Sequence, residues 1–535
     1  MRALKLLTLS AALLVPALPS LAVPDINNPV TQAVLEVYAE QIKENPSDYN
    51  AYYNRANEYY RHDEYIRALN DIDKALNLAP PSDDAFMLQA YILRAGIYDQ
   101  TKRTVQALND LNEAFKIDPT SYFVVYQKAN AEYTLGKYSE AKEDYLRLQR
   151  LNPRSAEALI GLARVAVKEN NLGNANDYLA QAVSIDPNNP EIYIRRASVR
   201  KQMNDHNGAV DDLILAISTD RNGKTKALDE LVEYGNTNYA ATVAGLSNAI
   251  AQAPQVESFR YLRGVIAQAH YNYLAAITDF KTILDSNPNA YRGLYAAIAE
   301  CQYGLGLYTE ALDNINYALG IIHNNASYQA LRSKILRALG QTDEAINAAA
   351  DALAIDRNNS NALADMALAY YDAGKYEESS NLLGEAIMNS PETPSYYLLR
   401  AWISKGKLNR ETAAQSLCKT VADADQFYVD NVLSLKGFAL IELDEKEKAI
   451  QWMDNILNTV IDNDGLVNYY GACFYTLLGD HDKALRCVET SLDKGYADYH
   501  NWMDATDGYI NVAPLRDDLR FLNLINRHNA IFGRN

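Results

Sequence analysis

The sequence predicts an all-α chain built from a tandem array of short helical hairpins. A small residue recurs once per unit, at intervals of 33 to 36 residues with one interval of 39. Within a unit, apolar residues such as Leu363, Met366 and Tyr370 follow the i, i+3, i+7 spacing of a helix face. One such hairpin cannot bury its own apolar face, so neighbouring units must stack.

Thirteen small residues, one per unit, open the second helix of each predicted hairpin. Their short side chains let two helices approach closely, where a larger residue would overpack. In chain order they are Ala68, Ala107, Ala141, Ala175, Ala209, Thr242, Ala276, Ala311, Ala345, Ser379, Ala413, Ala449 and Ala484.

Glycine and proline mark the ends of the predicted helices. Glycine tolerates the left-handed backbone that ends a helix, and proline cannot continue one. The glycines expected at the end of a first helix are Gly136, Gly306, Gly340, Gly374 and Gly479. The prolines expected just after a second helix are Pro80, Pro119, Pro153, Pro187, Pro254, Pro288 and Pro391.

The first 22 residues have the layout of a secretory signal. A basic start with Arg2 and Lys5 precedes the apolar run 6–18, and small residues lead up to Ala22. The run is shorter than the ~20 residues that a membrane span needs. The sequence therefore predicts cleavage after Ala22 and an exported protein, periplasmic or secreted, with no membrane segment after signal removal.

The unit is similar to the tetratricopeptide repeat (TPR). In the first unit the positions of that family's signature hold Tyr52, Ala56, Tyr59, Ala68, Ile72, Ala75 and Pro80, and the pattern covers about residues 47–495. The resemblance implies a right-handed α-solenoid of about thirteen helix-turn-helix repeats with capping helices at both ends. It also implies that first helices line a concave groove that binds protein or peptide partners.

The predicted organisation has six parts. They are a signal (1–22), an N-terminal linker and capping helix (23–46), units 1–5 (47–221), units 6–10 (222–391), units 11–13 (392–495) and a C-terminal cap (496–535). The sixth unit departs from the pattern at Glu230 and Thr242, and the eleventh loses its second-helix pattern after Ala414. These two units are the expected joints.

Three further segments complete the expected architecture. Val30, Val34, Tyr38 and Ile42, spaced four residues apart, predict the N-terminal capping helix. The stretch 80–84, with two prolines, predicts a longer loop before the second unit. The stretch 513–521 resembles a segment that often closes such arrays.

The chain is acidic, with 50 Lys and Arg against 68 Asp and Glu, a net charge of −18. Signal removal takes away two cations and leaves −20. Because phosphate binding depends on cationic side chains, nucleic acid is excluded as an expected partner. Acidic pairs such as Asp71/Asp73 and Asp211/Asp212 are interpreted as solvated charge on helix surfaces.

No pattern of catalytic or metal-ligating residues stands out. The seven histidines lack metal-binding spacing, and no phosphate loop or hydrolase motif occurs. The stretch 462–465 resembles a calcium loop, but its closing glutamate position holds Gly471. Cys473 and Cys487, on the two helices of one hairpin, either pair or remain free thiols. The sequence predicts no cofactor, no metal and no catalytic residue.

Tyrosine is the residue type that bears on binding, with 39 Tyr against 10 Phe and 3 Trp. In the family, the fifth and twelfth residues of a repeat face the groove. Here nine of those positions hold tyrosine: Tyr53, Tyr60, Tyr126, Tyr133, Tyr234, Tyr261, Tyr303, Tyr371 and Tyr469. Tyrosine offers a large contact area and a hydroxyl at low entropic cost, which suits peptide recognition. The alternative is that these rings only pack helices, since the family tolerates tyrosine there.

The ninth position of three repeats adds polar groups that can hydrogen-bond a ligand. The groove residues predicted together are Tyr53, Asn57, Tyr60, Tyr126, Asn130, Tyr133, Arg164, Tyr261 and Tyr371. The Lys/Asn carboxylate clamp of chaperone-binding relatives is absent, because its lysine position in the first unit is Tyr53.

The sequence thus favours an exported, non-catalytic scaffold that binds an extended protein or peptide along its groove, most strongly over units one to three. The alternative is a module for envelope polysaccharide or other glycans, whose sugar rings stack on exposed tyrosines. An enzyme is disfavoured, because only residues 23–46 and 496–535 of the mature chain lie outside the repeats.

Overall fold

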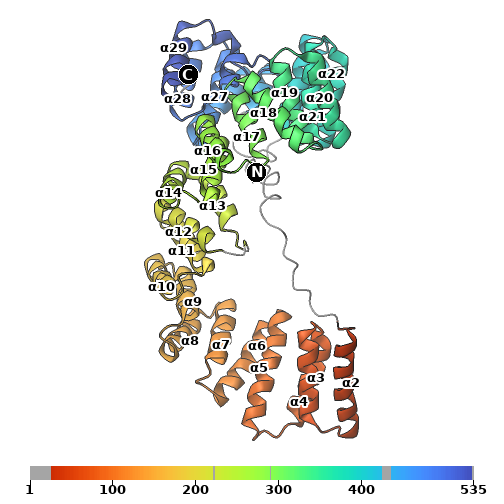
Figure 1. Cartoon of the computed structure of the whole chain (residues 1–535), viewed down its shortest axis with the longest axis vertical. Coiled ribbons are helices and arrows are strands. Elements are labelled where there is room, and N and C mark those ends of the chain that lie inside the picture. The colour runs from red at the N-terminus through yellow and green to blue at the C-terminus, as the bar shows by residue number, and fades with distance from the viewer. Residues whose placement is uncertain (1–25, 221–222, 224, 289–290, 424–434, 533–535) are drawn as a thin grey trace. The chain divides into compact units, whose positions relative to one another are not determined.

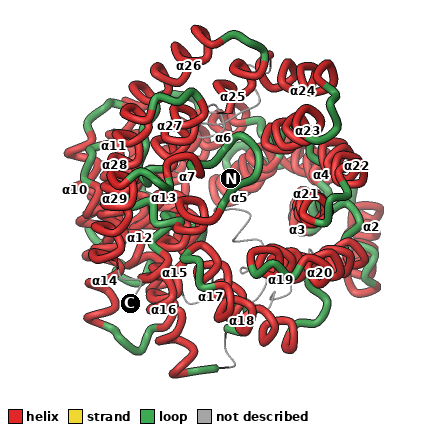
Figure 2. Tube along the Cα trace, turned by 90° about the horizontal axis from the view of Figure 1, so that it is seen from above, coloured by secondary structure: helices red, strands yellow, loops and turns green. Residues whose placement is uncertain are grey.

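The described part of the chain contains only helices and loops (Figure 1, Figure 2). The computed structural model describes residues 26–220, 223, 225–288, 291–423 and 435–532. The predicted signal lies outside them. The chain divides into two compact units: the N-terminal unit holds the described residues up to Leu231, and the C-terminal unit those from Val232.

The N-terminal unit is a row of helical hairpins that follows a single helix, α2 (Pro29–Glu44). The first helices of its pairs are α3 (Tyr49–Arg61), α5 (Asp84–Gln100), α7 (Tyr122–Thr134), α9 (Ala156–Lys168) and α11 (Pro190–Gln202). The second helices are α4 (Tyr65–Leu78), α6 (Thr104–Ile117), α8 (Tyr138–Leu151), α10 (Leu172–Ile185) and α12 (His206–Thr219). The division between the units falls within α13 (Ala227–Thr237), in the sixth pair.

The C-terminal unit begins with the end of α13, which α14 (Tyr239–Gln252) follows, and then continues the pairing. Its further first helices are α15 (Glu257–Ala269), α17 (Leu294–Gly304), α19 (Ala326–Ala338), α21 (Ser360–Asp372), α23 (Pro394–Gly406), α25 (Leu435–Glu442) and α27 (Leu466–Leu477). Their second helices are α16 (Tyr273–Ser286), α18 (Tyr308–Ile321), α20 (Thr342–Ile355), α22 (Tyr376–Asn389), α24 (Glu411–Asp423), α26 (Lys446–Thr459) and α28 (His481–Asp493). A π-turn η3 (His500–Asp504), a 3-10 turn η4 (Ala513–Leu515) and α29 (Leu519–Phe532) follow.

The predicted helix ends are confirmed. All five predicted glycines have φ between 73° and 77°, in the left-handed region that ends a helix. Each of the seven predicted prolines stands two residues after the end of a second helix. In other hairpins Asp63, Asn170 and Asn204 take the left-handed position.

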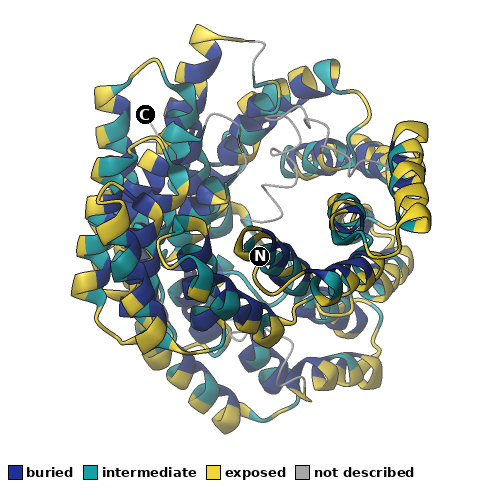
Figure 3. Cartoon of the chain, turned by 90° about the horizontal axis from the view of Figure 1, so that it is seen from below, coloured by how far each residue is buried: buried dark blue, intermediate teal, exposed yellow. Residues whose placement is uncertain are grey.

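A buried stripe along each helix holds the pairs together (Figure 3). Twelve of the thirteen recurring small residues are at most 2% exposed. The exception is Ala413, which is exposed, while Ala414 is 1% exposed. The α23–α24 turn has four residues where the α21–α22 turn has three, so the register moves by one. Counted from Ala414, the buried pattern continues through Cys418 and Val421, and the loss expected after Ala414 does not occur.

The single interval of 39 residues also has a different origin from the one expected. Helix α5 has 17 residues where α3 and α7 have 13, so four of the five additional residues lengthen α5 by about one turn. Only one lies in the loop 79–83, which has five residues where the α6–α7 loop has four. The prolines at 80 and 81 mark a loop, and they carry no information on the length of the helix that follows.

Helix α2 forms as predicted, with Asn28 as its N-cap, but the face that it buries differs. Thr31 and Leu35 are 8% and 7% exposed, whereas Val30 is 71% exposed. The Thr31 hydroxyl lies 3.4 Å from Nε2 of His62, at the end of α3. Spacing of four residues drifts around a helix, so Val30 turns away from the contact.

Buried ion pairs join the two helices of several hairpins. A cation on the first helix meets an aspartate 16 residues later on the second. The pairs are Arg55–Asp71 (2.6 Å), Arg94–Asp110 (2.7 Å), Lys128–Asp144 (2.5 Å), Arg196–Asp212 (2.6 Å) and Arg263–Asp279 (2.7 Å). Asp71 and Asp212 are therefore buried rather than solvated, because a partner from the neighbouring helix neutralises each carboxylate.

Candidate functional site

First helices of several neighbouring hairpins contact one another in each unit. Helix α3 contacts α5 and α7 contacts α9 in the N-terminal unit, and the contacts α17–α19, α19–α21, α23–α25 and α25–α27 follow in the C-terminal unit. An extended ligand on such a row meets several hairpins in succession. We call these rows the N-terminal and the C-terminal first-helix surface.

Three predicted groove residues come together on α7 and α9. Oδ1 of Asn130 accepts hydrogen bonds from the Tyr145 hydroxyl (2.7 Å) and from Nη1 of Arg164 (3.1 Å). The Arg164 guanidinium lies over the Tyr133 ring, with Cζ 4.0 Å from its centroid, which is a cation–π contact. Among the described residues, no carboxylate lies within ion-pair distance of Arg164. The guanidinium is thus oriented by two neighbours but not neutralised.

Tyr145, on α8, fixes this cluster and was not predicted as a site residue. Its ring is fully buried, and a Cβ at Gly161 of α9 would overlap it. Helix α9 therefore packs against the Tyr145 ring at a distance that only glycine allows. Burial raises the pKa of the Tyr145 hydroxyl, which therefore remains a donor to Asn130. A glycine inside a helix of the sequence was the signal that could have revealed this close approach.

Three more predicted residues lie on α3. Tyr53 packs edge-on against Phe86 of α5, with ring centroids 5.7 Å apart, and Tyr60 lies against Gly96 of the same helix. Burial raises the pKa of both tyrosines. Asn57 is half-buried, and its side chain makes no hydrogen bond within the described part of the chain. The two tyrosines thus help to pack α3 on α5 and remain partly exposed.

The remaining predicted residues lie in separate surroundings. Tyr126 is half-buried on α7 and stacks on Tyr122, with ring centroids 6.4 Å apart. Tyr261 is 7% exposed and belongs to the packed core of the C-terminal unit. Tyr371 is half-buried on α21, with its ring centroid 4.8 Å from that of Trp402. Tyr126 shares α7 with Asn130 and Tyr133 and packs on the same core cluster as Tyr133, whereas Tyr261 and Tyr371 belong to the C-terminal unit.

The C-terminal first-helix surface carries the chain's own C-terminal segment. We call residues 496–511, between α28 and η4, the strap. His500 of the strap lies between two tyrosines, with Nε2 2.9 Å from the Tyr303 hydroxyl and Nδ1 2.7 Å from the Tyr308 hydroxyl. The Tyr308 hydroxyl donates to Asp504 at 2.5 Å. Burial lowers the pKa of His500 to about 4, so a neutral ring accepts from Tyr303 and donates to Tyr308.

Further along the strap, Asp507 accepts a hydrogen bond from Nη2 of Arg337 on α19 at 2.6 Å. Nε of the same arginine donates to Asp372 on α21, also at 2.6 Å. Gly508 follows, with Leu399 of α23 as its nearest side-chain neighbour. The strap therefore contacts side chains from several first helices of its own unit.

Aromatic residues anchor the strap at its start. Tyr496, Tyr499 and Trp502 are at most 2% exposed, and Nε1 of Trp502 donates to the backbone oxygen of Tyr496 (3.1 Å). The Tyr499 hydroxyl lies 2.6 Å from Nδ1 of His528 on α29. Burial raises the pKa of Asp498, between these anchors, to about 7. The sequence assigned this region only to a cap; its aromatic residues outside the repeat pattern were the available signal.

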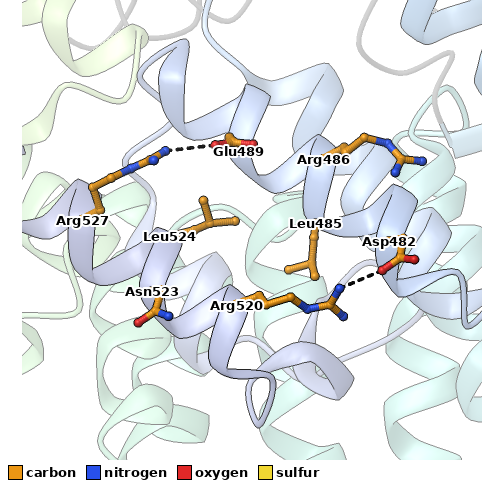
Figure 4. A pocket seen from close by; sticks show the side chains of 8 residues that line it. All are labelled: Asp482, Leu485, Arg486, Glu489, Arg520, Asn523, Leu524 and Arg527. Atoms are coloured by element: carbon orange, nitrogen blue, oxygen red, sulfur yellow. Dashed lines mark hydrogen bonds and ion pairs between the residues drawn. The ribbon is translucent and has the colours of Figure 1, made fainter.

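A shallow pocket lies between α28 and α29 (Figure 4). Across it Arg520 binds Asp482 at 2.8 Å and Arg527 binds Glu489 at 3.2 Å, with Leu485 and Leu524 between them. Opposite charges and an apolar centre are what the junction of a cap with the last hairpin needs. We therefore assign this pocket to capping.

The features that resembled metal or redox sites have structural roles. Asp462 caps α27 by accepting from the backbone nitrogens of Val467 and Asn468, each at 3.2 Å. Within the described ranges, no three His, Cys, Asp or Glu side chains are grouped to hold a metal. All four cysteines are buried free thiols, so Cys473 and Cys487 are unpaired in this structure.

Paired helices with a shared first-helix surface define a class of protein, the α-solenoid scaffold for protein–protein interaction. Within the part of the chain that the structure describes, no helix is long and apolar enough to cross a bilayer.

Comparison with protein families identifies the particular repeat. Models described as "Tetratricopeptide repeat" match residues 88–121, 126–190 and 336–403. The chain is a tetratricopeptide repeat protein, a family whose members bind peptide or protein partners and are generally non-catalytic. The number of about thirteen repeats stays a prediction.

The chain also resembles several solved structures. YrrB, described as a TPR protein with an unusual peptide-binding site, is 22% identical, with 37% of this chain and 98% of that chain covered and a TM-score of 0.31. Yeast Tom70 is 17% identical over 90% of this chain and 95% of that chain, with a TM-score of 0.39. MamA is 17% identical, with 35% of this chain and 96% of that chain covered and a TM-score of 0.27. Comparison with curated proteins gave no match.

Proposed function

We propose that this chain is an exported, non-catalytic scaffold that binds an extended, acidic protein or peptide segment along its N-terminal first-helix surface. The observation that carries the proposal is the Asn130–Tyr133–Arg164 cluster. Arginine presents a planar fork of donors that matches a carboxylate. Here the fork is held by Asn130 and Tyr133, and none of the described carboxylates neutralises it. A ligand carboxylate would supply the missing charge.

The surrounding side chains suit the rest of such a ligand. Tyr126 on α7 and Tyr53 and Tyr60 on α3 keep part of their rings exposed. A partly exposed tyrosine ring offers apolar contact and a hydroxyl to a peptide backbone. The C-terminal first-helix surface, in contrast, is already covered by the strap, which favours the N-terminal unit as the primary site.

The test is a dodecapeptide array in which each acidic peptide is compared with its Asn/Gln counterpart. Replacing Arg164→Gln is expected to weaken retention of the acidic peptides about tenfold or more, because a charge-assisted hydrogen bond contributes roughly 1.5–3 kcal/mol. Arg154→Gln, which removes an exposed arginine in the loop before α9, is the matched control and should change little. Equal retention of the acidic peptides by the wild type and by Arg164→Gln would contradict the proposal.

The alternative function, glycan binding, is tested by a glycan array probed with the wild type and the variants. Tyr133 carries Arg164 on one face and Tyr126 stacks on Tyr122, so these two rings have less surface left for sugars. Glycan retention that Tyr126→Ala abolishes and Arg164→Gln spares would favour the polysaccharide function instead.

Export rests on residues 1–22, which lie outside the described residues. The basic start, the apolar run and the small residues up to Ala22 support it. We expect the protein purified from its native host to begin at Val23, as measured by intact mass and N-terminal sequencing. A mature protein that retains Met1–Ala22 would contradict export by this route.

A further inference from the structure

The middle of the strap lies on the C-terminal first-helix surface in the manner of a bound ligand. We call residues 503–511 the tip. It follows Trp502, which is fully buried, and precedes Val512, which is also fully buried. Between these anchors the tip is less enclosed, with Asp504 and Thr506 exposed and Asp507 half-buried. The tip is thus a loop with fixed ends that is open to solvent at Asp504 and Thr506, while Tyr509 and Ile510 pack on the core of the unit.

Two carboxylates make the polar side-chain contacts of the tip to α18 and α19, and the backbone oxygen of Ala505 also accepts from Nη2 of Arg516 at 2.6 Å. Asp504 accepts from the Tyr308 hydroxyl at 2.5 Å, and Asp507 accepts from Nη2 of Arg337 at 2.6 Å. The two aspartates are three residues apart, and their partners come from different hairpins, α17–α18 and α19–α20. Arg337 of the first helix α19 and Tyr308 of the second helix α18 therefore present two donors that match two acidic side chains at that spacing.

The partners of the tip remain in place without it. Tyr308 is also held by His500, which belongs to the anchored part of the strap, and Arg337 is also held by Asp372 of α21. The hydroxyl and the guanidinium are thus oriented before any carboxylate arrives, and such preorganised donors favour binding. The side chains of Arg337 and Asp507 are 21% and 24% exposed, so water can reach and separate this pair.

We propose that the C-terminal first-helix surface is a second binding site, for an extended partner segment with two carboxylates three residues apart. Residues 504–507 of the tip occupy this site in the free protein and are displaced by the partner. Because the tip is tethered, it acts at a high effective concentration, and a free peptide competes poorly until the tip is weakened. This site lies in a different unit from the Arg164 cluster, so an experiment that contradicts one of the two binding sites leaves the other untouched.

The probe is a fluorescein-labelled peptide with the sequence of residues 503–511, added to the full-length protein and followed by fluorescence anisotropy. Asp504→Asn with Asp507→Asn in the protein removes the competing charges and leaves the surface intact. We expect this double variant to bind the peptide at least tenfold more tightly than the wild type. Asp517→Asn, which removes an exposed charge just beyond η4, is the control and should bind like the wild type.

Two results would overturn the proposal. One is binding to the double variant that is no tighter than binding to the wild type. The other is equal binding of a peptide with asparagine in place of both aspartates, which would show that the surface does not recognise the carboxylates. The comparison of the two peptides uses the same double variant of the protein. Arg337→Lys in the double-variant background, which retains the charge but loses the fork, should weaken binding at least threefold.

Discussion

Replacing Lys128→Met is expected to destabilise the α7–α8 hairpin by about 3–5 kcal/mol at pH 7. Nζ of Lys128 lies 2.5 Å from both Glu132 and Asp144, whose side chains are only 6% and 7% exposed. The substitution would leave two buried carboxylates close together without a cation. Breaking a buried pair costs more than the pair itself contributes, since an uncompensated charge remains in a medium of low dielectric.

The loss of stability caused by Lys128→Met should depend on pH in a defined direction. Burial raises the pKa of Glu132 above its ordinary value, and Lys128 opposes this rise. A carboxyl whose pKa is raised in the folded state favours folding below its unfolded pKa and loses that contribution as pH rises through the folded pKa. Without Lys128 the pKa of Glu132 rises further. The variant should therefore be most destabilised above pH 7 and recover as the pH falls toward about 4.5.

Hydrogen exchange of the α7 and α8 amides, measured at pH 5 and pH 8 and corrected for intrinsic rates, tests this prediction. Opening of the variant hairpin should increase by a factor of about 100 or more at pH 8 and by less at pH 5. Lys116→Met is the matched control: that lysine is 67% exposed and pairs with an exposed Glu113, so its loss should cost no more than about 0.5 kcal/mol. Equal effects of the two substitutions would contradict the burial argument.

Replacing Trp502→Ala is expected to cost the C-terminal unit about 3–5 kcal/mol. Trp502 is fully buried, lies edge-on to Tyr469 and Tyr496, and packs against Phe521 of α29. Its removal leaves a cavity where the strap, the last hairpin and the cap meet. The loss should also release the strap, because Nε1 of Trp502 no longer bonds to Tyr496.

Denaturant unfolding followed by hydrogen exchange separates the two units and checks this result. Protection should fall in the strap, α27 and α29, while α3–α10 of the N-terminal unit keep wild-type protection. Trp452→Ala on α26 is the control, since that ring is half-buried and its truncation should cost less. A Trp502 variant as stable as the Trp452 variant would show that the strap is not an integral part of the core.

Local patterns in the sequence were enough to predict the helical hairpins and their ends. Gly136 and Pro153 act on the backbone of their own residues, so their effect can be inferred without knowing any distant contact. The recurring small residues worked for the same reason, since each reports a close helix approach inside one unit. Where a turn gained a residue, before α24, the fixed period pointed to Ala413 instead of Ala414.

The predicted groove residues were derived from positions in a repeat, which specify a face of a helix but not its neighbours. Position alone could not show that Asn130, Tyr133 and Arg164 meet while Tyr261 is enclosed in the core. Each outcome depends on side chains from an adjacent hairpin. For Arg164 the decisive neighbours, Asn130 and Tyr133, lie about one repeat earlier in the chain.

By itself, the sequence determined that this chain is an array of tetratricopeptide hairpins, because periodicity and helix-ending residues act over a few turns. Only the tertiary structure decided which charges are buried in pairs, as for Asp71 with Arg55, and which surface is already covered. The strap reaches Arg337 from Asp507, 170 residues away along the chain. A contact over that separation arises from the stacking of several hairpins, and no local pattern of residues encodes it.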